Sequence, residues 1–250
     1  MSLSDLKLFD CQCAYGTVSR PPFRYARDIP ELLEEMDFCG IAKALVYHSG
    51  QRFGPLPVYN LQIVEDIRAY PRLMASWSIL PPQTGELPSA QQFLAEMRAR
   101  QVKVLRAFPD EYHFVLNRDS CGELLEAVTE RRIPLFVKAA APVLGTLLRE
   151  FPNLTMVAVA QGPHSLERYL RPLVEQYPNF YLETSSYLVE GLIEAFCERY
   201  GHSRLLFGSG FPDNCAGGAL LRLVQADIPE ESKAAIAAGN LERLLREVAS

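Results

Sequence analysis

Eight short apolar runs, separated by stretches of helical periodicity, dominate the pattern of this sequence. Each run has the length and the β-branched or aromatic content of a buried strand. In the helical stretch 29–40, Pro30 suits a first helical turn and Gly40 suits a C-terminal cap. The eight runs are LKLFDC (6–11), KALVYH (43–48), LMASWSI (73–79), VKVLRAF (102–108), IPLFVK (133–138), TMVAVA (155–160), NFYLET (179–184) and RLLFG (204–208).

A strand followed by a helix, repeated about eight times, predicts an α/β fold with a parallel sheet and helical crossovers. A closed (β/α)8 TIM barrel accounts for this count without exposed sheet edges, and chains of this length commonly form such a barrel as one domain. The alternative is an open doubly wound sheet, but no G-x-G-x-x-G turn follows an early strand. We therefore expect a single TIM-barrel domain over residues 1–250.

The composition argues against several classes of partner. A net charge of −5 with scattered lysines and arginines offers no basic stripe, so no nucleic-acid partner is expected. No apolar run approaches the roughly 20 residues that cross a bilayer, and residues 1–7 lack the pattern of a signal peptide. The six cysteines are not densely spaced, which predicts reduced thiols. We expect a cytoplasmic protein with no membrane partner.

In a barrel of this type the working residues project from the carboxyl ends of the strands. The residues that close the predicted strands are therefore the candidates for a functional site. They are Asp10, Gln12, Tyr47, His48, Trp77, Arg106, Lys138, Gln161, Glu183, Thr184 and the turn 208–213.

Several segments resemble motifs of the amidohydrolase-related family of TIM barrels, the branch that includes decarboxylases and lactonases. The start FDCQCAYG looks like its first-strand motif D-x-H-x-H-x-G, and FPNLTMVAVAQG looks like its F-P-x-L, strand, A-H-x-G segment. PNFYLETSS is similar to its next strand, and SRLLFGSGFP is similar to its terminal R-L-L-F-G-S-D-x-P. IAAGNLERLL is similar to the G-N-x-x-R-L-L helix that closes the chain. The resemblance spans nearly the whole sequence. Because barrels of this family often pair, a homodimer is one oligomeric state that the resemblance allows.

The departures from the family pattern fall on its metal ligands. When the first motif is aligned on its aspartate and its glycine, Gln12 and Ala14 stand where the family has two histidines. Lys138 and Gln161 stand where histidines are usual in the fifth and sixth strands, and Gly210 replaces the aspartate of the eighth. A catalytic zinc site needs about three imidazole, thiolate or carboxylate ligands, which these residues do not supply. We therefore expect no metal, no other cofactor, and no metal-hydroxide hydrolysis by the family's route.

An alternative metal site would use Cys11 and Cys13. A one-residue slip of the first strand would turn both thiols into the barrel as a pair of soft ligands. In the aligned register both thiols face the surrounding helices, where a buried cysteine behaves as a small apolar residue.

Lys138 and Arg106 are the candidate anion-binding residues. At the mouth of the barrel the Lys138 ammonium could polarise a carbonyl or hold a carboxylate. The competing interpretation is an ion pair with Asp10 or Glu183 that only fills the site. Arg106 could grip a carboxylate or phosphate with two nitrogens, or form a structural salt bridge.

His48 and His113 are the candidates for proton transfer near neutral pH, with Asp10 as a catalytic partner. A structural role is the alternative for each histidine. Aromatic side chains near the strand ends, Trp77, Tyr47, Phe108 and Tyr187, could wall a pocket or simply pack beneath loops. The candidate substrate-binding residues are Arg106, Gln12, Gln161, Trp77, Glu183 and Asp213.

The leading hypothesis is a metal-independent enzyme that acts on a small carboxylate-bearing molecule. It would hydrolyse an ester or lactone C–O bond, whose leaving group needs less help than that of an amide, or act as a lyase by decarboxylation. One alternative is a catalytically inactive barrel that binds a metabolite or a partner protein. The other is a hydrolase with a Cys11/Cys13 metal site.

Overall fold

A computed structural model describes residues 6–18, 20–161 and 166–249 of the chain. All eight predicted strands are present in it, and the third is interrupted by one residue, Ser76. The strands are β1 (Leu8–Tyr15), β2 (Ile41–His48), β3 (Leu73–Ala75), β4 (Trp77–Ser78), β5 (Leu105–Ala107), β6 (Leu135–Val137), β7 (Met156–Ala158), β8 (Phe180–Glu183) and β9 (Leu205–Leu206).

The strands pair in parallel and in chain order. β1, β2 and β3 form one run, and β4 to β9 form another. The chain leaves β3 beside β2 and enters β4 beside β5 within a single extended segment. The first and last strands are joined by hydrogen bonds from the Cys11 amide to the Phe207 carbonyl (2.9 Å) and from the Gly210 amide to the Gln12 carbonyl (2.8 Å). A further parallel bridge links Cys13 and Phe211. The result is the closed TIM barrel that the sequence predicts.

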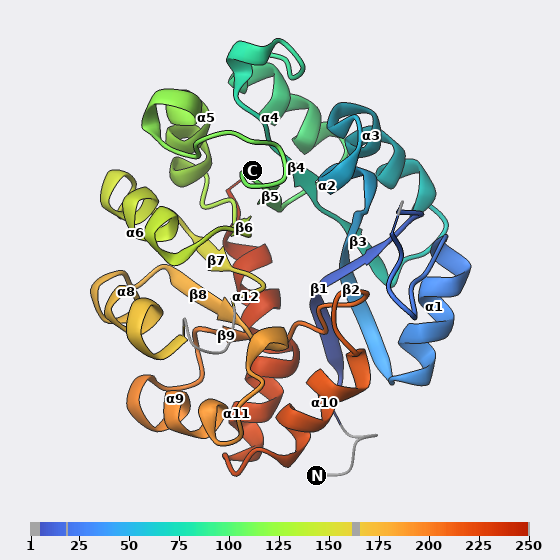
Figure 1. The fold of residues 1–250 in the computed structure, drawn as a ribbon, viewed down its shortest axis with the longest axis vertical. Coiled ribbons are helices and arrows are strands. Elements are labelled where there is room, and N and C mark those ends of the chain that lie inside the picture. The colour runs from blue at the N-terminus through green and yellow to red at the C-terminus, as the bar shows by residue number, and fades with distance from the viewer. Residues whose placement is uncertain (1–5, 19, 162–165, 250) are drawn as a thin grey trace.

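Helices surround the barrel strands (Figure 1). They are α1 (Ile29–Phe38), α2 (Gly50–Phe53), α3 (Leu56–Asp66), α4 (Ala90–Ala99), α5 (Arg118–Glu130), α6 (Ala141–Glu150), α8 (Arg171–Gln176), α9 (Leu192–Tyr200), α10 (Ala216–Gln225), α11 (Glu230–Ala234) and α12 (Asn240–Glu247). Short 3-10 turns span Pro82–Thr84 and Thr184–Ser186, and π-type turns span Leu166–Leu170 and Ala235–Gly239. No helix within the described ranges is long and apolar enough to cross a membrane.

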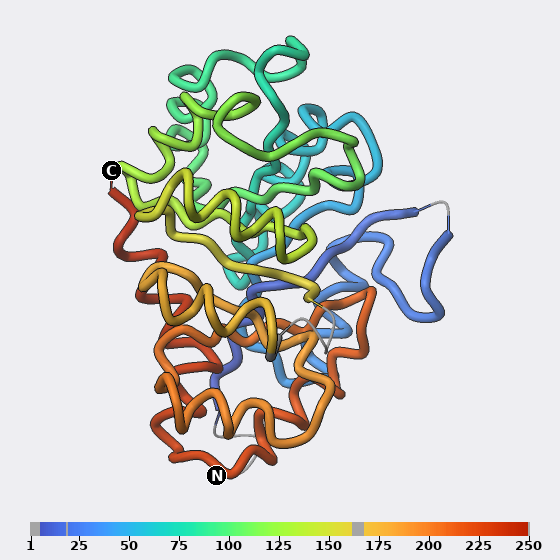
Figure 2. The backbone as a smooth tube through the Cα atoms, turned by 60° about the vertical axis from the view of Figure 1, so that its left-hand side comes forward, coloured from blue at the N-terminus to red at the C-terminus, as the bar shows by residue number. Residues whose placement is uncertain are grey.

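Local sequence signals set the ends of α1 as predicted. The Asp28 side chain accepts a hydrogen bond from the Glu31 amide (3.0 Å), Pro30 lies in the first turn, and the helix ends before Gly40, whose φ is +68°. In Figure 2, the segment that follows β1, on both sides of residue 19, extends away from the rest of the molecule.

Two apolar cores lie on the two sides of the barrel wall. The inner core collects side chains from β1, β2 and β6 to β9, and three leucines of α12 pack against it. The much larger outer core lies between the strands and the surrounding helices. The inner core fills one end of the barrel and leaves the other end, where the carboxyl ends of the strands lie, for polar side chains.

An irregularity in β1 decides which way its cysteines face. The pairing with β2 shifts register between Asp10 and Cys13, which is a β-bulge. Cys11 therefore packs in the inner core, whereas Cys13 packs in the outer core. The expectation that both thiols face the helices is corrected for Cys11, and the alternative that both face inward is corrected for Cys13. All six cysteines are free.

Candidate active site at the mouth of the barrel

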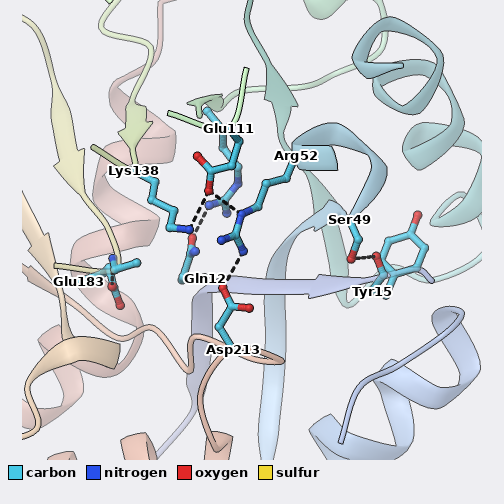
Figure 3. A network of polar contacts seen from close by, with 10 residues as sticks. Gln12, Tyr15, Ser49, Arg52, Glu111, Lys138, Glu183 and Asp213 are labelled. Atoms are coloured by element: carbon cyan, nitrogen blue, oxygen red, sulfur yellow. Dashed lines mark hydrogen bonds and ion pairs between the residues drawn. The ribbon is translucent and has the colours of Figure 1, made fainter. Parts of the chain in front are cut away.

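A chain of ion pairs crosses the mouth of the barrel (Figure 3). The Lys138 ammonium lies 2.7 Å from Oε1 of Glu111, and Nε of Arg52 lies 2.8 Å from the same oxygen. Nη1 of Arg52 lies 2.6 Å from Oδ2 of Asp213. Two cations therefore share one carboxylate oxygen, and one of them is also held by a second carboxylate.

Each member of this network follows a different barrel strand. Lys138 comes directly after β6, and its amide donates to the Ala107 carbonyl of β5 (3.1 Å). Glu111 lies in the loop after β5, Arg52 lies on α2 after β2, and Asp213 lies in the loop after β9. Because the carboxyl ends of parallel strands meet at one end of a barrel, residues far apart in sequence come together there.

The loop that carries Glu111 is tied to the turn that carries Arg52. The Tyr112 hydroxyl donates to the Gly54 carbonyl at 2.7 Å. Burial raises the pKa of Tyr112 to about 12, so this hydroxyl keeps its proton and remains a donor at neutral pH. The two segments are thus held at a fixed separation across the mouth.

The charges of the network reinforce one another. Burial alone would raise the pKa of Glu111, but the hydrogen bonds from Lys138 and Arg52 outweigh it and lower that pKa. Burial alone would lower the pKa of Arg52, but Tyr47, Asp213 and Glu111 raise it. Glu111 is therefore an anion and Arg52 a cation throughout the physiological pH range.

Two cavities open on either side of the shared carboxylate. One, of about 480 Å³, is lined by Lys138, Gln161, Asp110 and the start of α6. The other, of about 260 Å³, is lined by Arg52, Asp213, Tyr47, Phe53 and neighbouring residues. Glu111 binds one cation from the wall of each cavity, so it lies at the junction between them.

Arg106 and Gln12 lie beneath these cavities. Arg106 is 1% exposed, and its guanidinium lies between the rings of Tyr47 and Phe136, 4.7 and 4.9 Å from their centroids. It donates to Oγ of Ser76 (2.7 Å), to the Cys11 carbonyl (2.8 Å) and to Oε1 of Gln12. The guanidinium of Arg106 therefore donates its hydrogen bonds to groups of the protein itself. The structure therefore places Arg106 as a buried floor of the mouth, and not where it was expected to grip a substrate carboxylate.

The candidate histidines do not line either cavity. The ring of His48 stacks on Tyr59 at 4.3 Å and meets the edge of Tyr15 at 4.9 Å, and its Nδ1 accepts from the Gly50 amide at 2.9 Å. Burial lowers the pKa of His48, which makes the neutral ring its state at pH 7. His113 is exposed, in the loop after β5, with φ +54°. The geometry favours the structural alternative for His48.

The two buried carboxyl groups are bound by backbone amides. Asp10 accepts from the amides of Gln12 and Ser209, both at 2.9 Å, and so ties β1 to the turn after β9. Glu183 accepts from the amides of Ala160 (2.8 Å) and Ser185 (2.7 Å). Burial raises the pKa of both groups. Neither is the partner of Lys138, whose ion pair is with Glu111.

Trp77 and Gln161, two further residues predicted to contact a substrate, lie on different sides of the barrel wall. The Trp77 ring packs on Phe93 of α4, at 5.5 Å, outside the barrel wall. The expectation that Trp77 lines the mouth is corrected, because successive side chains of a strand point to opposite faces. Gln161 does line the larger cavity, and its amide nitrogen donates to the Ala139 carbonyl at 2.9 Å.

The residues at the family's metal-ligand positions do not fit a divalent cation. Ala14 has no donor atom, Lys138 presents an ammonium, and Gln12 is engaged by a guanidinium. Gly210 has φ +69°, and a Cβ there would lie 2.6 Å from Nδ2 of Asn214 and 2.8 Å from Cβ of Ser185. Within the described residues, no group of three or more His, Cys, Asp or Glu side chains is arranged to hold a metal ion.

Arg52 and Glu111 are the functional candidates that sequence reasoning missed. Neither closes a strand: each lies several residues beyond a strand end, in a segment without a motif. A signal was present, because both residues lie close behind the predicted strands 43–48 and 102–108, and VLRAFPDEYH carries Glu111 two residues before His113.

Comparison with known proteins identifies the family. The sequence matches the family model described as Amidohydrolase over residues 20–246, and the chain therefore belongs to the amidohydrolase family. A comparison with curated proteins found no match.

Solved structures share the fold over almost the whole chain. A TIM-barrel protein of Bordetella bronchiseptica is 18% identical with a TM-score of 0.73, covering 97% of this chain and 99% of its own. A dihydroxybenzoic acid decarboxylase of a Polaromonas species, with bound manganese and an inhibitor, is 14% identical with a TM-score of 0.74, covering 96% and 97%. A protein of Acinetobacter baumannii, described as a probable 2-pyrone-4,6-dicarboxylic acid hydrolase, is 13% identical with a TM-score of 0.67, covering 96% and 100%.

Proposed function

We propose that this protein is a metal-independent enzyme that acts on a small carboxylate-bearing molecule at the mouth of the barrel. It hydrolyses an ester or lactone C–O bond or removes a carboxyl group. The observation that carries the proposal is the pair of cations, Lys138 and Arg52, that converge on one carboxylate oxygen between two cavities. A site that binds one carboxylate in this way has the charge and geometry to bind another.

The roles follow from the positions of the side chains. Lys138 and Arg52 hold the substrate carboxylate and stabilise negative charge that develops on the reacting carbonyl. Gln161 and Asp110 line the cavity beside Lys138 and orient the rest of the substrate. Arg52 takes the clamp role that the sequence suggested for Arg106.

The comparisons support this class of reaction. One structural neighbour is described as a decarboxylase of an aromatic acid, and another as a hydrolase of a dicarboxylic acid. The acids named for both proteins carry carboxyl groups. The lysine and arginine side chains at this mouth supply positive charge from the chain itself, which supports a reaction without a metal.

The test is turnover of a panel of lactones, esters and carboxylic acids by chelator-treated protein. Lys138→Met should lower kcat/KM by about a hundredfold, the usual cost of losing a group that stabilises developing charge. Lys43→Met, which removes a lysine paired with Glu242 on α12, should leave it unchanged. Equal turnover by both variants would show that Lys138 takes no part in the reaction. A large gain of activity on adding Mn²⁺ or Zn²⁺ would overturn metal independence.

A second candidate function is a catalytically inactive binding barrel. The observation that favours it is that the cations at the mouth already have internal carboxylate partners. Binding of carboxylates by the unmodified protein, with no turnover of any compound in the panel, would decide for this alternative.

A further inference from the structure

We propose that Glu111 is an internal stand-in for the substrate, and that a ligand carboxylate enters the site by displacing it from Lys138 and Arg52. This inference rests on the proposed function and states how the same site is opened and which ligands open it. The ligand class is a small carboxylate whose charge replaces that of Glu111.

The contacts of Glu111 are unevenly divided between its two oxygens. Oε1 receives both cations, at 2.7 and 2.8 Å. Oε2 is buried and has no hydrogen-bond partner among the described residues. A buried carboxylate oxygen without a partner is unfavourable, since it has lost water and gained nothing. Glu111 therefore binds the two cations less well than their charges allow.

A free ligand is not attached to a loop, so its carboxylate can turn in a way that the carboxylate of Glu111 cannot. Glu111 is attached to a loop that the Tyr112 hydroxyl fixes to Gly54 at 2.7 Å, which limits how its carboxylate can turn. An untethered carboxylate can present one oxygen to Lys138 and the other to Arg52. Its body then has space in one of the adjoining cavities, of about 260 and 480 Å³.

The two cations remain in place when Glu111 leaves. Arg52 keeps its contact with Asp213 at 2.6 Å, and its guanidinium lies 4.6 Å from the centroid of the Phe53 ring. Lys138 is fixed at its backbone by the hydrogen bond to β5. Displacement therefore needs a rotation of the Glu111 side chain, and the binding groups are already positioned.

The test compares the affinity of benzoate for the intact protein and its variants by calorimetry. Removing the internal competitor with Glu111→Gln should tighten benzoate binding about tenfold or more, because a site that is open a tenth of the time binds tenfold more weakly than one that is always open. Glu86→Gln is the matched control. It makes the same change from carboxylate to amide at an exposed residue before α4, whose charge is close enough to raise the pKa of Tyr112. It vacates neither cation, and it should change the affinity less than twofold. Benzamide, which has the same shape without the charge, should bind no variant.

A shorter side chain provides an independent variant. Glu111→Asp keeps the charge but cannot reach both cations equally, and it should give a smaller gain than Glu111→Gln. The double variant Lys138→Met/Glu111→Gln should lose the gain, because one of the two cations is gone. Thermal unfolding of each variant shows that it is folded before its affinity is compared.

The failures of the two proposals are distinguishable. Equal affinities of the intact protein, Glu111→Gln and Glu111→Asp would overturn the displacement and leave the anion site standing. Equal gains from Glu86→Gln and Glu111→Gln would also overturn it, because the effect would then be one of overall charge. Absence of benzoate binding to every protein, including Glu111→Gln, would overturn the anion site and with it the proposed function.

Discussion

His48 closes β2 at the mouth, yet its surroundings are those of a structural residue. Its ring lies between Tyr59 and Tyr15, and the backbone at Gly16 approaches it so closely that a Cβ there would lie 2.7 Å from Nε2. Gly16 also has φ +108°, where other residues are strained. The packing of two aromatic rings and a glycine around His48 therefore supports a structural role for it.

His48 should make the stability of the protein depend on pH in a predictable direction. Because burial lowers its pKa below the ordinary 6.5, the unfolded chain binds a proton that the folded chain does not as the pH falls below 6.5. Stability that is present above pH 6.5 is then lost at up to about 1.4 kcal/mol per pH unit, until the pH passes the folded pKa.

The measurement is the free energy of unfolding in urea between pH 7.5 and pH 5. His48→Gln should have a shallower pH dependence than the intact protein, and the exposed His113→Gln should not differ from it. Parallel curves for all three proteins would show that His48 is protonated equally in both states.

At the residue scale, the rule of strand ends predicted a position at the mouth for Lys138, Gln161 and Asp213, and each of them lines a cavity there. Arg52 and Glu111 were not predicted, because their positions depend on loop conformation, which leaves no periodic pattern in the sequence. The burial of Arg106 likewise depends on Tyr47, Phe136 and Ser76, which come from three other strand segments.

Among the elements, the turn at α2 and the loop after β5 act as a pair. Arg52 and Glu111 meet in an ion pair, and Tyr112 and Gly54 meet in a hydrogen bond. Helix α2 has only four residues, and no side chain caps its first turn. Contacts with the opposite loop, more than its own helical propensity, therefore hold it in position.

Tyr112→Phe should loosen this pair of elements without disturbing the barrel. The change removes one half-buried hydrogen bond, with an expected loss of about 0.5–1.5 kcal/mol in the free energy of unfolding. Amide hydrogen exchange in residues 108–116 and 50–54 should accelerate, while exchange in β6 and β7 stays the same. Tyr70→Phe, in the turn before β3 at the other end of the barrel, is the control. Unchanged exchange in both loops would contradict the role of the hydroxyl.

The element boundaries follow the sequence where caps and apolar runs are strong. α1 begins and ends near the predicted residues because of Asp28, Pro30 and Gly40. The bulge in β1 could not be read from the sequence, because Phe9, Cys11 and Cys13 alternate regularly and give no sign of an extra residue. The orientation of Cys11 follows from that bulge alone.

The whole molecule is organised by the closure of β1 on β9 and by α12 beneath the inner core. The first contact joins segments far apart in the sequence, and the second packs α12 on side chains from strands on both sides of the closure, so the barrel is complete only when both halves of the chain are in place. The order of the strands was predictable, since eight apolar runs with helical crossovers have few arrangements that leave no edge. We therefore expect the chain to unfold as a single cooperative unit.

Leu244→Ala on α12 tests this expectation. Leu244 is 2% exposed in the inner core, and its truncation should lower the free energy of unfolding by about 2–5 kcal/mol. Leu221→Ala on α10, where the side chain is 47% exposed, should change it by no more than about 0.5 kcal/mol. Trp77 fluorescence and far-ultraviolet circular dichroism should report one coincident transition. Two separate transitions would show that the barrel contains independent folding units.

Arg106, Arg52 and Lys138 place positive charge under and around the mouth, and all three are side chains of the protein itself. Charge carried by side chains is part of the chain from its synthesis, and no ion has to bind first. Neither dilution nor competition between ions can remove it. Its amount is also fixed. A bound metal ion can be exchanged for one of different size or acidity. The charge and acidity of these three side chains can change only through substitution or through a ligand that lies against them.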